Sequence, residues 1–311
     1  MILTHIHAKQ KLLVLGVSGM LGHTLFARLS ECGHFEVRGT VRKLEPLARY
    51  FTPELLENVQ SDTDADNFDS VIKAVACFKP DQVINCIGII KQLSTATESI
   101  PSIMINALFP HRLASLCKAT GARLIQISTD CVFDGMRGNY REEDASNASD
   151  IYGRTKFLGE LDYPHCITLR TSIIGHELGT HHGLIEWFLA QESGVRGFPR
   201  AIFSGLTTIE LTHVIAEHVI PNRDLYGLYH VSATPVNKYD LLRMVAQVYG
   251  RKTEIEPDAD FYADRSLDSS RFTRATGYVS PSWEELIERM HHEFLTAGYY
   301  SKRQELSHGS L

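Results

Sequence analysis

Four side chains with potential chemistry stand in a row in the segment ISTDCVFDG, residues 127–135. They are the hydroxyls of Ser128 and Thr129, the carboxylate of Asp130 and the thiol of Cys131, and they follow directly on an apolar run. A hydroxyl at such a place donates a hydrogen bond, a carboxylate takes up a proton, and a thiolate acts as a nucleophile. The segment is therefore a candidate site, although residue types alone leave open which group acts.

A second group with potential chemistry is YGRTK, where Tyr152 and Lys156 are four residues apart. On a helix this spacing places both side chains on one face. An ammonium close to a phenol favours the phenolate, so we expect Lys156 to lower the pKa of Tyr152 and make it a better proton shuttle near neutral pH. The pattern is short, and its position after the fifth expected strand is what makes it informative.

A glycine-rich turn, GVSGMLG, follows the first apolar run and places Gly16, Gly19 and Gly22 in a GxxGxxG spacing. Glycines are needed where a chain turns sharply, where backbone N–H groups approach a pyrophosphate, and where a helix packs closely on a sheet. The helix that follows offers its N-terminal N–H groups and dipole to the phosphates. We therefore expect a dinucleotide to bind at Gly16, Ser18, Gly19, Met20, Leu21 and Gly22.

The identity of the dinucleotide is expected to show about twenty residues further on, at the end of the second strand. That strand ends in GTVRK, with Arg42 and Lys43 and no carboxylate before Glu45. Two cations at this place suit a ribose 2′-phosphate, so the sequence predicts NADP(H) rather than NAD(H). Asp62, which follows a third strand expected at 56–60, is our candidate for the adenine amino group, with Asp64 and Asp66 as alternatives.

The elements that must position these residues alternate between strands and helices over the first 170 residues. Short apolar runs predict buried strands at 11–16, 35–41, 82–88, 123–128 and 166–171. Stretches of helical length lie between them, such as 21–32 and 105–120. This alternation predicts an α/β fold with a doubly wound parallel sheet, which binds ligands at the carboxyl ends of its strands.

After Thr171 the pattern changes to longer helices and less regular strands. One helix is expected to begin after a cap at Asn237 and to stop at Gly250, and another begins with the capping box of Ser282 and Glu285 and runs to Gly298. We expect residues 1–170 to form an NADP-binding Rossmann domain. Residues 171–311 are expected to form mainly a smaller α/β substrate lobe, with some segments returning to the first domain.

Composition excludes several classes of function. A formal net charge of −6 gives no electrostatic case for nucleic acid or an anionic membrane as a partner. No apolar stretch approaches the length of a membrane span, and the Gly-broken run near the N-terminus does not fit a signal peptide. The six cysteines stand singly without a CxxC pair, which predicts reduced, mostly buried thiols in a cytoplasmic protein.

The segment HELGTH, residues 176–181, is similar to the zinc-protease motif HExxH, but its second histidine comes one residue late. At that spacing the two imidazoles point to nearly opposite sides of a helix, and Gly179 disfavours a helix in any case. We therefore expect no metal site in this segment or elsewhere in the chain.

Taken together, the glycine-rich turn, the strand-end STD and YxxxK resemble the extended short-chain dehydrogenase/reductase superfamily. Within it, the segments LGVSGMLG, INCIG, STDCVFDG, YGRTKFLGE and LRTSIIG resemble the dTDP-4-dehydrorhamnose reductase family, and RSLDSSRF (265–272) resembles that family's segment near the sugar nucleotide. The resemblance implies NADPH-dependent reduction of the 4-keto group of a nucleotide-linked 4-keto-6-deoxyhexose, in cell-surface polysaccharide synthesis. A nucleotide sugar is thus the expected substrate.

The resemblance also implies roles for individual residues. Thr129, Tyr152 and Lys156 match the catalytic set, with Thr129 donating to the substrate carbonyl oxygen, and Asn106 supports the active site. The cofactor is implied to lie along Asn85, Cys86, Ile87 and Gly88, and to contact Tyr152 and Lys156. From their placement alone, Lys91 and Arg265 are candidates for binding the substrate diphosphate.

Position 131 distinguishes between members of the superfamily. The related 4,6-dehydratases usually carry Glu directly after TD, as the base that removes a sugar proton, whereas Cys131 stands there in this chain. A buried thiol of ordinary pKa is a poor base, which favours simple reduction. Reductases usually have Tyr at this position, so the identity of the sugar stays open.

Other functions within the resemblance also stay open. They are a dihydrostreptose-type synthase that contracts the ring, a nucleotide-sugar epimerase, and a non-catalytic subunit resembling the regulatory subunit of methionine adenosyltransferase. A homodimer is the one assembly that we keep in view, although no residue of the sequence specifies it.

Overall fold

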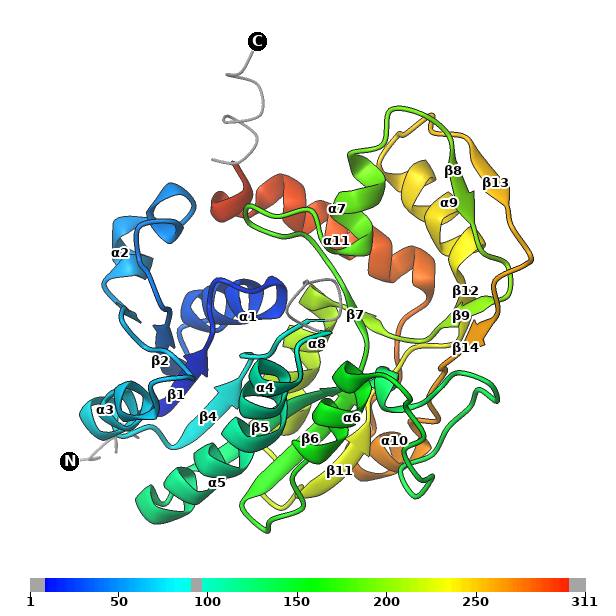
Figure 1. Ribbon diagram of the computed structural model, residues 1–311. Helices are drawn as coiled ribbons and strands as arrows, with labels where there is room; N and C mark the ends of the chain where they lie inside the picture. The colour runs from blue at the N-terminus through cyan, green and yellow to red at the C-terminus, as the bar shows by residue number, and fades with distance from the viewer. Residues whose placement is uncertain (1–8, 91–96, 302–311) are drawn as a thin grey trace, which may run out of the picture.

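A seven-stranded parallel sheet forms the centre of the larger part of the molecule, in a computed structural model that describes residues 9–90 and 97–301 (Figure 1). Its strand order is β11-β6-β5-β4-β1-β2-β3. The strands are β1 (Gln10–Leu15), β2 (Phe35–Thr40), β3 (Val59–Gln60), β4 (Gln82–Asn85), β5 (Arg123–Thr129), β6 (Cys166–Thr171) and β11 (Gly227–His230). The expected doubly wound α/β fold is confirmed.

Helices cover both faces of this sheet because its strands are apolar on both sides. In β1, Leu12 and Val14 pack into one core with α1 (Met20–Glu31) and α8 (Thr208–Val214). Leu13 and Leu15 pack into a second core, with helices α3 (Phe68–Phe78) and α5 (Phe109–Thr120). The alternation of side chains along one buried strand thus fixes which helices lie on which face.

The expected strand at 82–88 ends three residues early, at Asn85. The Asn85 side chain accepts a hydrogen bond from the Ile87 backbone N–H at 3.0 Å, so the chain turns out of the ladder after β4. The helix expected at 105–120 is also divided, into a π-helical turn, Ile103–Leu108, and α5. Both departures lie at the carboxyl edge of the sheet, where the predicted site residues lie.

A smaller lobe lies at the upper right of Figure 1, and its short strands and helices come mainly from the second half of the chain. The cap predictions are confirmed: Asn237 accepts from the Asp240 N–H at 2.8 Å, and Ser282 accepts from the Glu285 N–H at 3.3 Å. The lobe comprises α7 (Leu184–Leu189), β7 (Ile173–Ile174), β8 (Val195–Gly197), β9 (Ala201–Phe203), β10 (Leu206–Thr207), β12 (Val236–Asn237), α9 (Lys238–Val248), β13 (Ile255–Pro257), β14 (Ala263–Asp264) and α11 (Trp283–Thr296).

The chain returns from this half to the main sheet. Strand β11 pairs in parallel with β6 at the sheet edge, and α10 (Ser270–Thr276) packs beside it. Helix α8 packs against α1, the helix that follows the glycine-rich turn. Residue 170 therefore does not separate the chain into two independent parts, and the division into two domains stays a prediction.

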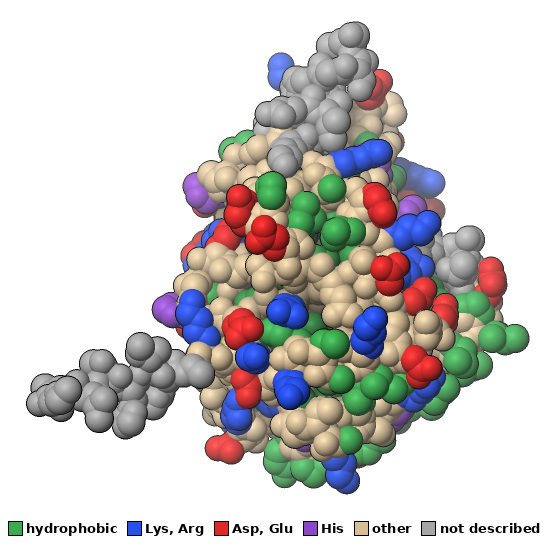
Figure 2. Space-filling view, turned by 90° about the vertical axis from the view of Figure 1, so that its left-hand side faces the viewer, with side chains coloured by type: hydrophobic (Ala, Val, Ile, Leu, Met, Phe, Trp, Pro, Cys, Tyr) green, Lys and Arg blue, Asp and Glu red, His purple; other side chains and the backbone are tan. Residues whose placement is uncertain are grey.

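The remaining elements within the described ranges are short. They include α2 (Pro53–Leu56), α4 (Ser99–Ser102), α6 (Ile151–Leu158), 3-10 turns at Leu47–Arg49 and Asp130–Val132, and a further π-helical turn at Ile215–Val219. Within the described ranges, no helix has the length and apolarity that a membrane crossing requires. Figure 2 shows acidic and basic side chains mixed on one face of the molecule, with no field of a single sign.

Candidate active site

The glycine-rich turn connects β1 to α1 in a conformation that its glycines permit. Gly16 has φ of 83°, and its N–H and that of Val17 donate to the Thr40 carbonyl at 3.1 and 3.0 Å. A Cβ on Gly22 would overlap the Gly16 carbonyl, so α1 packs directly against the turn. Gly19 is the N-cap of α1 and has no side chain there, which leaves the first N–H groups of the helix open to a ligand.

The side chain of Thr40 is a further sign of a binding site at this turn. Its hydroxyl is the buried side-chain oxygen within 9–90 and 97–301 that has no hydrogen-bond partner. Buried polar groups are nearly always satisfied, so a hydroxyl without a partner fits a site that a bound polar group completes. The open helix start and this hydroxyl together fit a dinucleotide.

The residues predicted to select the cofactor gather beyond β2 and β3. Arg42 and Lys43 are exposed directly after β2, and neither forms an ion pair with a residue in the described part of the chain. Asp62 has φ of 59°, and its N–H donates to the Arg42 carbonyl at 3.2 Å. The structure therefore brings the two cations and Asp62 to one corner, at the same edge as the glycine-rich turn.

The segment after β4 lies beside the turn because β4 is the neighbour of β1 in the sheet. The Cys86 N–H donates to the Leu15 carbonyl at 3.1 Å, and a Cβ built on Gly16 would lie 3.0 Å from the Ile87 side chain. This is the topological switch point of the sheet, where doubly wound folds bind their ligands. The predicted cofactor residues Asn85 to Gly88 thus lie where such a ligand passes.

Asn106 holds the backbone that follows this segment. It lies in the π-helical turn, and its side chain accepts from the Ile89 N–H at 2.9 Å and donates to the Ile89 carbonyl at 3.2 Å. A Cβ on Gly88 would lie 3.3 Å from the Asn106 side-chain oxygen and 3.9 Å from Lys156 Nζ. Asn106 therefore fixes the wall of the site next to Lys156, and π-helical turns are frequent at functional sites.

Thr129 and Tyr152 meet at the carboxyl end of β5. Thr129 is the last residue of the strand, its side chain accepts from the Cys131 N–H at 3.1 Å, and its hydroxyl is close enough to the Tyr152 phenol to influence the pKa of that group. Tyr152 lies in the first turn of α6, whose N-cap Asp150 accepts from the Gly153 N–H at 2.7 Å. The structure thus brings together two of the predicted catalytic residues from two separate elements.

Lys156 is buried one turn further along the same helix. Its ammonium donates to the Ile127 carbonyl of β5 at 2.8 Å. Burial lowers the pKa of Lys156 to about 8, while the negative charge of Glu160 acts in the opposite direction. Lys156 therefore belongs to the cluster, and its ammonium loses its proton at a pH of about 8.

The expected effect of Lys156 on Tyr152 is wrong for this structure. The pKa of the Tyr152 phenol is raised above its ordinary value because burial disfavours the phenolate, and Cys131 adds to the rise, while the Thr129 hydroxyl acts in the opposite direction. Helical spacing does place both side chains on one face, but the ammonium is directed to the strand carbonyl at Ile127. The phenol is thus held in its protonated form.

Asp130 and Cys131 lie next to this cluster in a 3-10 turn. Asp130 is buried, accepts from the Thr129 hydroxyl at 3.2 Å, and burial raises the pKa of its carboxyl. Cys131 and Cys86 are half-buried, and Cys32 and Cys77 are exposed. The expectation of mostly buried thiols is therefore wrong. None of the six cysteines forms a disulfide.

Arg265 approaches the cluster from the second half of the chain. It is half-buried, and its guanidinium donates to the carbonyls of Phe133 at 2.9 Å and Asp134 at 3.0 Å. Its positive charge also acts on Asp130, so the segments that carry Thr129 and Arg265 lie close together. Lys91, the other predicted diphosphate ligand, lies outside the described residues.

The segment HELGTH is not helical, and its two histidines differ in burial although both lie within ion-pair distance of Glu186. His176 is buried between the Glu186 carboxylate at 2.6 Å and the Tyr249 hydroxyl at 2.8 Å, whereas the His181 side chain is 62% exposed. Within the described residues, no group of three His, Cys, Asp or Glu side chains is placed to hold a metal ion.

Sequence reasoning missed a buried polar cluster behind the catalytic residues. Ser128, Glu160, Arg170 and His230 are hydrogen-bonded to one another there. The available signal was an arginine inside the strand CITLRT, all of whose residues are buried. A buried charge requires a partner, so Arg170 by itself pointed to an acidic residue nearby.

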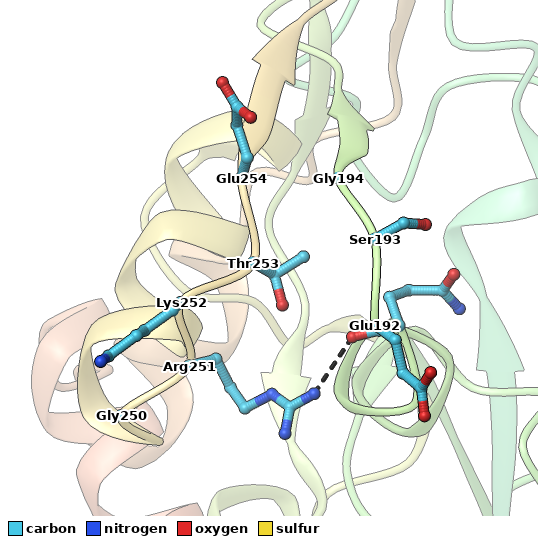
Figure 3. Close-up of a pocket in the computed structure, with 9 residues that line it drawn as sticks. Glu192, Ser193, Gly194, Gly250, Arg251, Lys252, Thr253 and Glu254 are labelled. Carbon is cyan, nitrogen blue, oxygen red and sulfur yellow. Dashed lines mark hydrogen bonds between the residues drawn. The ribbon is translucent and has the colours of Figure 1, made fainter.

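A pocket lies in the smaller lobe, between residues 191–194 and 250–254 (Figure 3). Arg251 closes its lower end by donating to the Gln191 carbonyl at 3.1 Å. None of the predicted site residues lines this pocket, and its walls are open surface loops with charges of both signs. It is therefore separate from the candidate active site.

Comparison with solved structures gives the same fold. A crystal structure of dTDP-4-dehydrorhamnose reductase from Bacillus anthracis in complex with NADP superimposes with a TM-score of 0.77, covering 92% of this chain and all of the other at 24% identity. The Bordetella bronchiseptica enzyme WbmG in complex with NAD gives a TM-score of 0.75 at 18% identity, covering 96% of this chain and 97% of the other.

Sequence comparison reaches both halves of the chain. A dTDP-4-dehydrorhamnose reductase from Aggregatibacter actinomycetemcomitans is 27% identical over 305 residues, which cover 90% of this chain and 98% of that protein. Methionine adenosyltransferase 2 subunit beta from Danio rerio is 25% identical over 270 residues, covering 77% and 74%. The model of the RmlD substrate binding domain matches residues 10–187, more than half of the chain, and the chain therefore belongs to this family.

Proposed function

We propose that this chain catalyses the NADPH-dependent reduction of the 4-keto group of a nucleotide-linked 4-keto-6-deoxyhexose, as a dTDP-4-dehydrorhamnose reductase. The observation that carries the proposal is the cluster of Thr129, Tyr152 and Lys156 at the same sheet edge as the glycine-rich turn. The full-length similarity to a reductase of that name supports it. The reaction belongs to cell-surface polysaccharide synthesis.

Each residue of the cluster has a defined task in the reaction. Bound NADPH supplies the hydride that reduces the ketone carbon. Tyr152, whose pKa is raised so that the phenol carries its proton, donates that proton to the developing alkoxide. Thr129 donates a hydrogen bond to the same oxygen, and the Lys156 ammonium holds the ribose of the cofactor.

The cofactor preference rests on the corner beyond β2. Arg42 and Lys43 bind the 2′-phosphate, which distinguishes NADP(H) from NAD(H), and Asp62 accepts from the adenine amino group. Gly16, Ser18, Gly19, Met20, Leu21 and Gly22 hold the pyrophosphate with backbone N–H groups and the start of α1. Asn85, Cys86, Ile87 and Gly88 line the path to the nicotinamide.

Reduction is favoured over dehydration by the residue types beside Tyr152. A 4,6-dehydratase needs a carboxylate base next to the sugar C5, and the side chain after Asp130 is the thiol of Cys131. Arg265, whose charge acts on Asp130, is our candidate for binding the substrate diphosphate. The nucleotide and the stereochemistry of the sugar are not specified by these residues.

Spectrophotometric NADPH oxidation tests the proposal directly. The purified chain is expected to oxidise NADPH with dTDP-4-dehydrorhamnose or with a related 4-keto sugar nucleotide. No turnover with any such sugar would contradict the proposal. NMR of the product separates simple reduction from a dihydrostreptose-type ring contraction, and net NADPH consumption excludes an epimerase.

A binding role is the second candidate because the Danio rerio relative is named as a subunit of methionine adenosyltransferase. The same fold is then used to bind a partner enzyme rather than a sugar. The presence of Thr129, Tyr152 and Lys156 in one cluster favours the reductase. Co-elution with a methionine adenosyltransferase, together with absent keto-sugar turnover, would reverse that preference.

We also propose a homodimer, formed by the surface of α4, the π-helical turn after it and α6. The segment SIPSIMINAL (99–108) has no charged residue, and it packs against α6. Its exposed apolar side chains join those of α6 in one patch, made of Ile100, Ile103, Met104, Leu108, Phe157 and Leu158. A two-fold axis brings identical patches together, which an uncharged surface tolerates without repulsion.

Light scattering coupled to size-exclusion chromatography tests this assembly. The wild-type chain is expected to elute as a dimer and Ile100→Glu as a monomer, because Ile100 is 77% exposed and a buried carboxylate opposes pairing. A monomeric wild-type chain at micromolar concentration would refute the dimer. We also propose that the protein is cytoplasmic, because its six cysteines stand singly in the sequence without a CxxC pair.

A further inference from the structure

A buried ion pair ties the catalytic helix to the strands behind it. Arg170 of β6 donates to both carboxylate oxygens of Glu160, at 2.8 and 2.6 Å, and the two side chains are only 1% and 9% exposed. Ser128 donates to the same carboxylate at 2.6 Å. Glu160 follows the last turn of α6, and Ser128 precedes Thr129, so this carboxylate connects the two elements that carry the catalytic residues.

The same arginine extends the connection to the substrate side. Its third nitrogen donates to His230 Nε2 of β11 at 3.0 Å, so the imidazole is neutral with its proton on Nδ1. That proton is donated to the Tyr140 carbonyl at 3.1 Å, and the His230 backbone N–H donates to the Glu142 carboxylate at 2.9 Å. The segment around Tyr140 is thereby held to the sheet.

Aromatic packing continues this connection to Arg265. The Arg170 guanidinium lies 4.9 Å from the centre of the Phe133 ring, which stacks on Tyr140 at 4.0 Å. The carbonyl of Phe133 accepts from Arg265 at 2.9 Å. One chain of contacts therefore runs from the end of the catalytic helix, through Glu160 and Arg170, to the cation proposed for the substrate diphosphate.

Glu160 also acts on the charge of Lys156. Glu160 lies four residues after Lys156, just beyond the end of α6, and the titratable groups that act on the ammonium are Glu160 and Cys86, from the segment after β4. Burial disfavours the charged amine, and the carboxylate partly offsets this effect. Loss of the carboxylate charge would therefore make the charged form of the buried Lys156 amine less stable.

We propose that Glu160 and Arg170 are positioning residues, which hold the catalytic helix in register with the substrate segment 133–142, and that the Glu160 carboxylate also keeps Lys156 in its charged form. This inference rests on the proposed function, because it explains how the residues of the proposed active site are kept in position. A network that is fully hydrogen-bonded and shielded from water resists small displacements, and displacements of about 1 Å can cost about a hundredfold in rate.

Glu160→Gln tests the proposal because glutamine keeps the shape of the side chain and removes its charge. In the wild-type enzyme, kcat is expected to fall as the pH rises through the pKa of Lys156, about 8. Without the carboxylate that pKa is lower, so the alkaline fall of kcat moves to lower pH. A shift of one pH unit would reduce kcat at pH 9 about tenfold beyond any loss at pH 6.

Glu210→Gln is the matched control. Glu210 is also buried, 2.8 Å from Arg289, but it belongs to α8 and does not contact the catalytic cluster. Its variant is expected to lose stability without a change in the pH profile. A role of Glu160 in stability alone would make both variants behave alike, with lower melting temperatures and an unshifted alkaline limb, and that result would overturn the proposal.

NMR of the chain labelled with ¹³C-lysine gives a readout that does not need turnover. The Lys156 resonance, assigned with Lys156→Arg, is expected to titrate near pH 8 in the wild type and at lower pH in Glu160→Gln, while Ser128→Ala, which keeps the charge, leaves the midpoint in place. An unchanged midpoint in Glu160→Gln would refute the inference. A shifted midpoint in a chain that reduces no keto sugar would refute the proposed function and leave the inference standing.

Discussion

The α-carbon of Gly153 lies directly against the carbonyl oxygen of Cys131, so closely that a Cβ on residue 153 would overlap that oxygen. This contact sets the distance between α6, which carries Tyr152, and the turn after β5, which follows Thr129. A second glycine, Gly159, repeats the arrangement at the other end of the helix, where its Cβ would overlap the Asn106 carbonyl. The catalytic helix is thus seated by close backbone contacts at both ends.

Gly153→Ala is therefore expected to destabilise the chain and to move Tyr152 away from Thr129. An added methyl group in a packed site costs about 1–3 kcal/mol, which calorimetry measures as a lower melting temperature, and kcat should fall with it. Gly298→Ala serves as the control because no atom lies within 4 Å of its Cβ position. Equal melting temperatures for the two variants would contradict the close seating of α6.

Tyr152→Phe is expected to lower kcat by about 10²–10⁴-fold, since it removes the proton donor and keeps the ring. Binding of NADPH, measured by fluorescence titration, should change little because the helix and the glycine-rich turn are intact. Substantial turnover by this variant would refute the mechanism, even if the chain proved to be a reductase.

Arg42→Ala is expected to weaken NADPH binding about tenfold or more and to leave NADH binding almost unchanged. A charge-assisted hydrogen bond to the 2′-phosphate is lost only with NADPH. Arg243→Ala, which removes an exposed arginine of α9, is the control for the change in net charge. Equal losses for the two cofactors would count against the proposed contact.

His230 should make the stability of the folded chain depend on pH. Burial, with a smaller effect of the Arg170 charge, lowers the pKa of His230 to about 3, below its ordinary value of about 6.5. The unfolded chain therefore binds a proton that the folded chain rejects. The stabilisation is complete above pH 6.5 and declines as the pH falls toward 3, by about 1.4 kcal/mol per pH unit.

Urea unfolding of the wild type and His230→Gln between pH 7 and 4 measures this contribution as a difference in slope. Glu293, whose pKa is raised to about 7 by burial, acts with the opposite sign between pH 4.5 and 7. It is present in both proteins and cancels in the difference. His181→Gln, at an exposed imidazole, should keep the wild-type slope, and identical slopes in all three proteins would refute the assignment.

The elements of the fold were predictable because their signals are local. Apolar runs of strand length, the glycines after β1 and the caps at Asn237 and Ser282 each depend on residues a few positions apart, and the structure has them at or near the predicted places. The exceptions have identifiable causes. The Asn85 side chain ends β4 early, and the start of the helix expected at 105–120 takes π-helical geometry.

The sequence by itself determined which residues carry the candidate chemistry, because Thr129, Tyr152 and Lys156 stand in short patterns beside predicted strand ends and helices. The tertiary structure decided their environment. Burial raises the pKa of Tyr152 where helical spacing alone predicted a decrease, since desolvation depends on every segment packed around the ring. Likewise, Ser128, Arg170 and His230 come from three different strands, and only the parallel pairing of β5, β6 and β11 brings them into one network with Glu160.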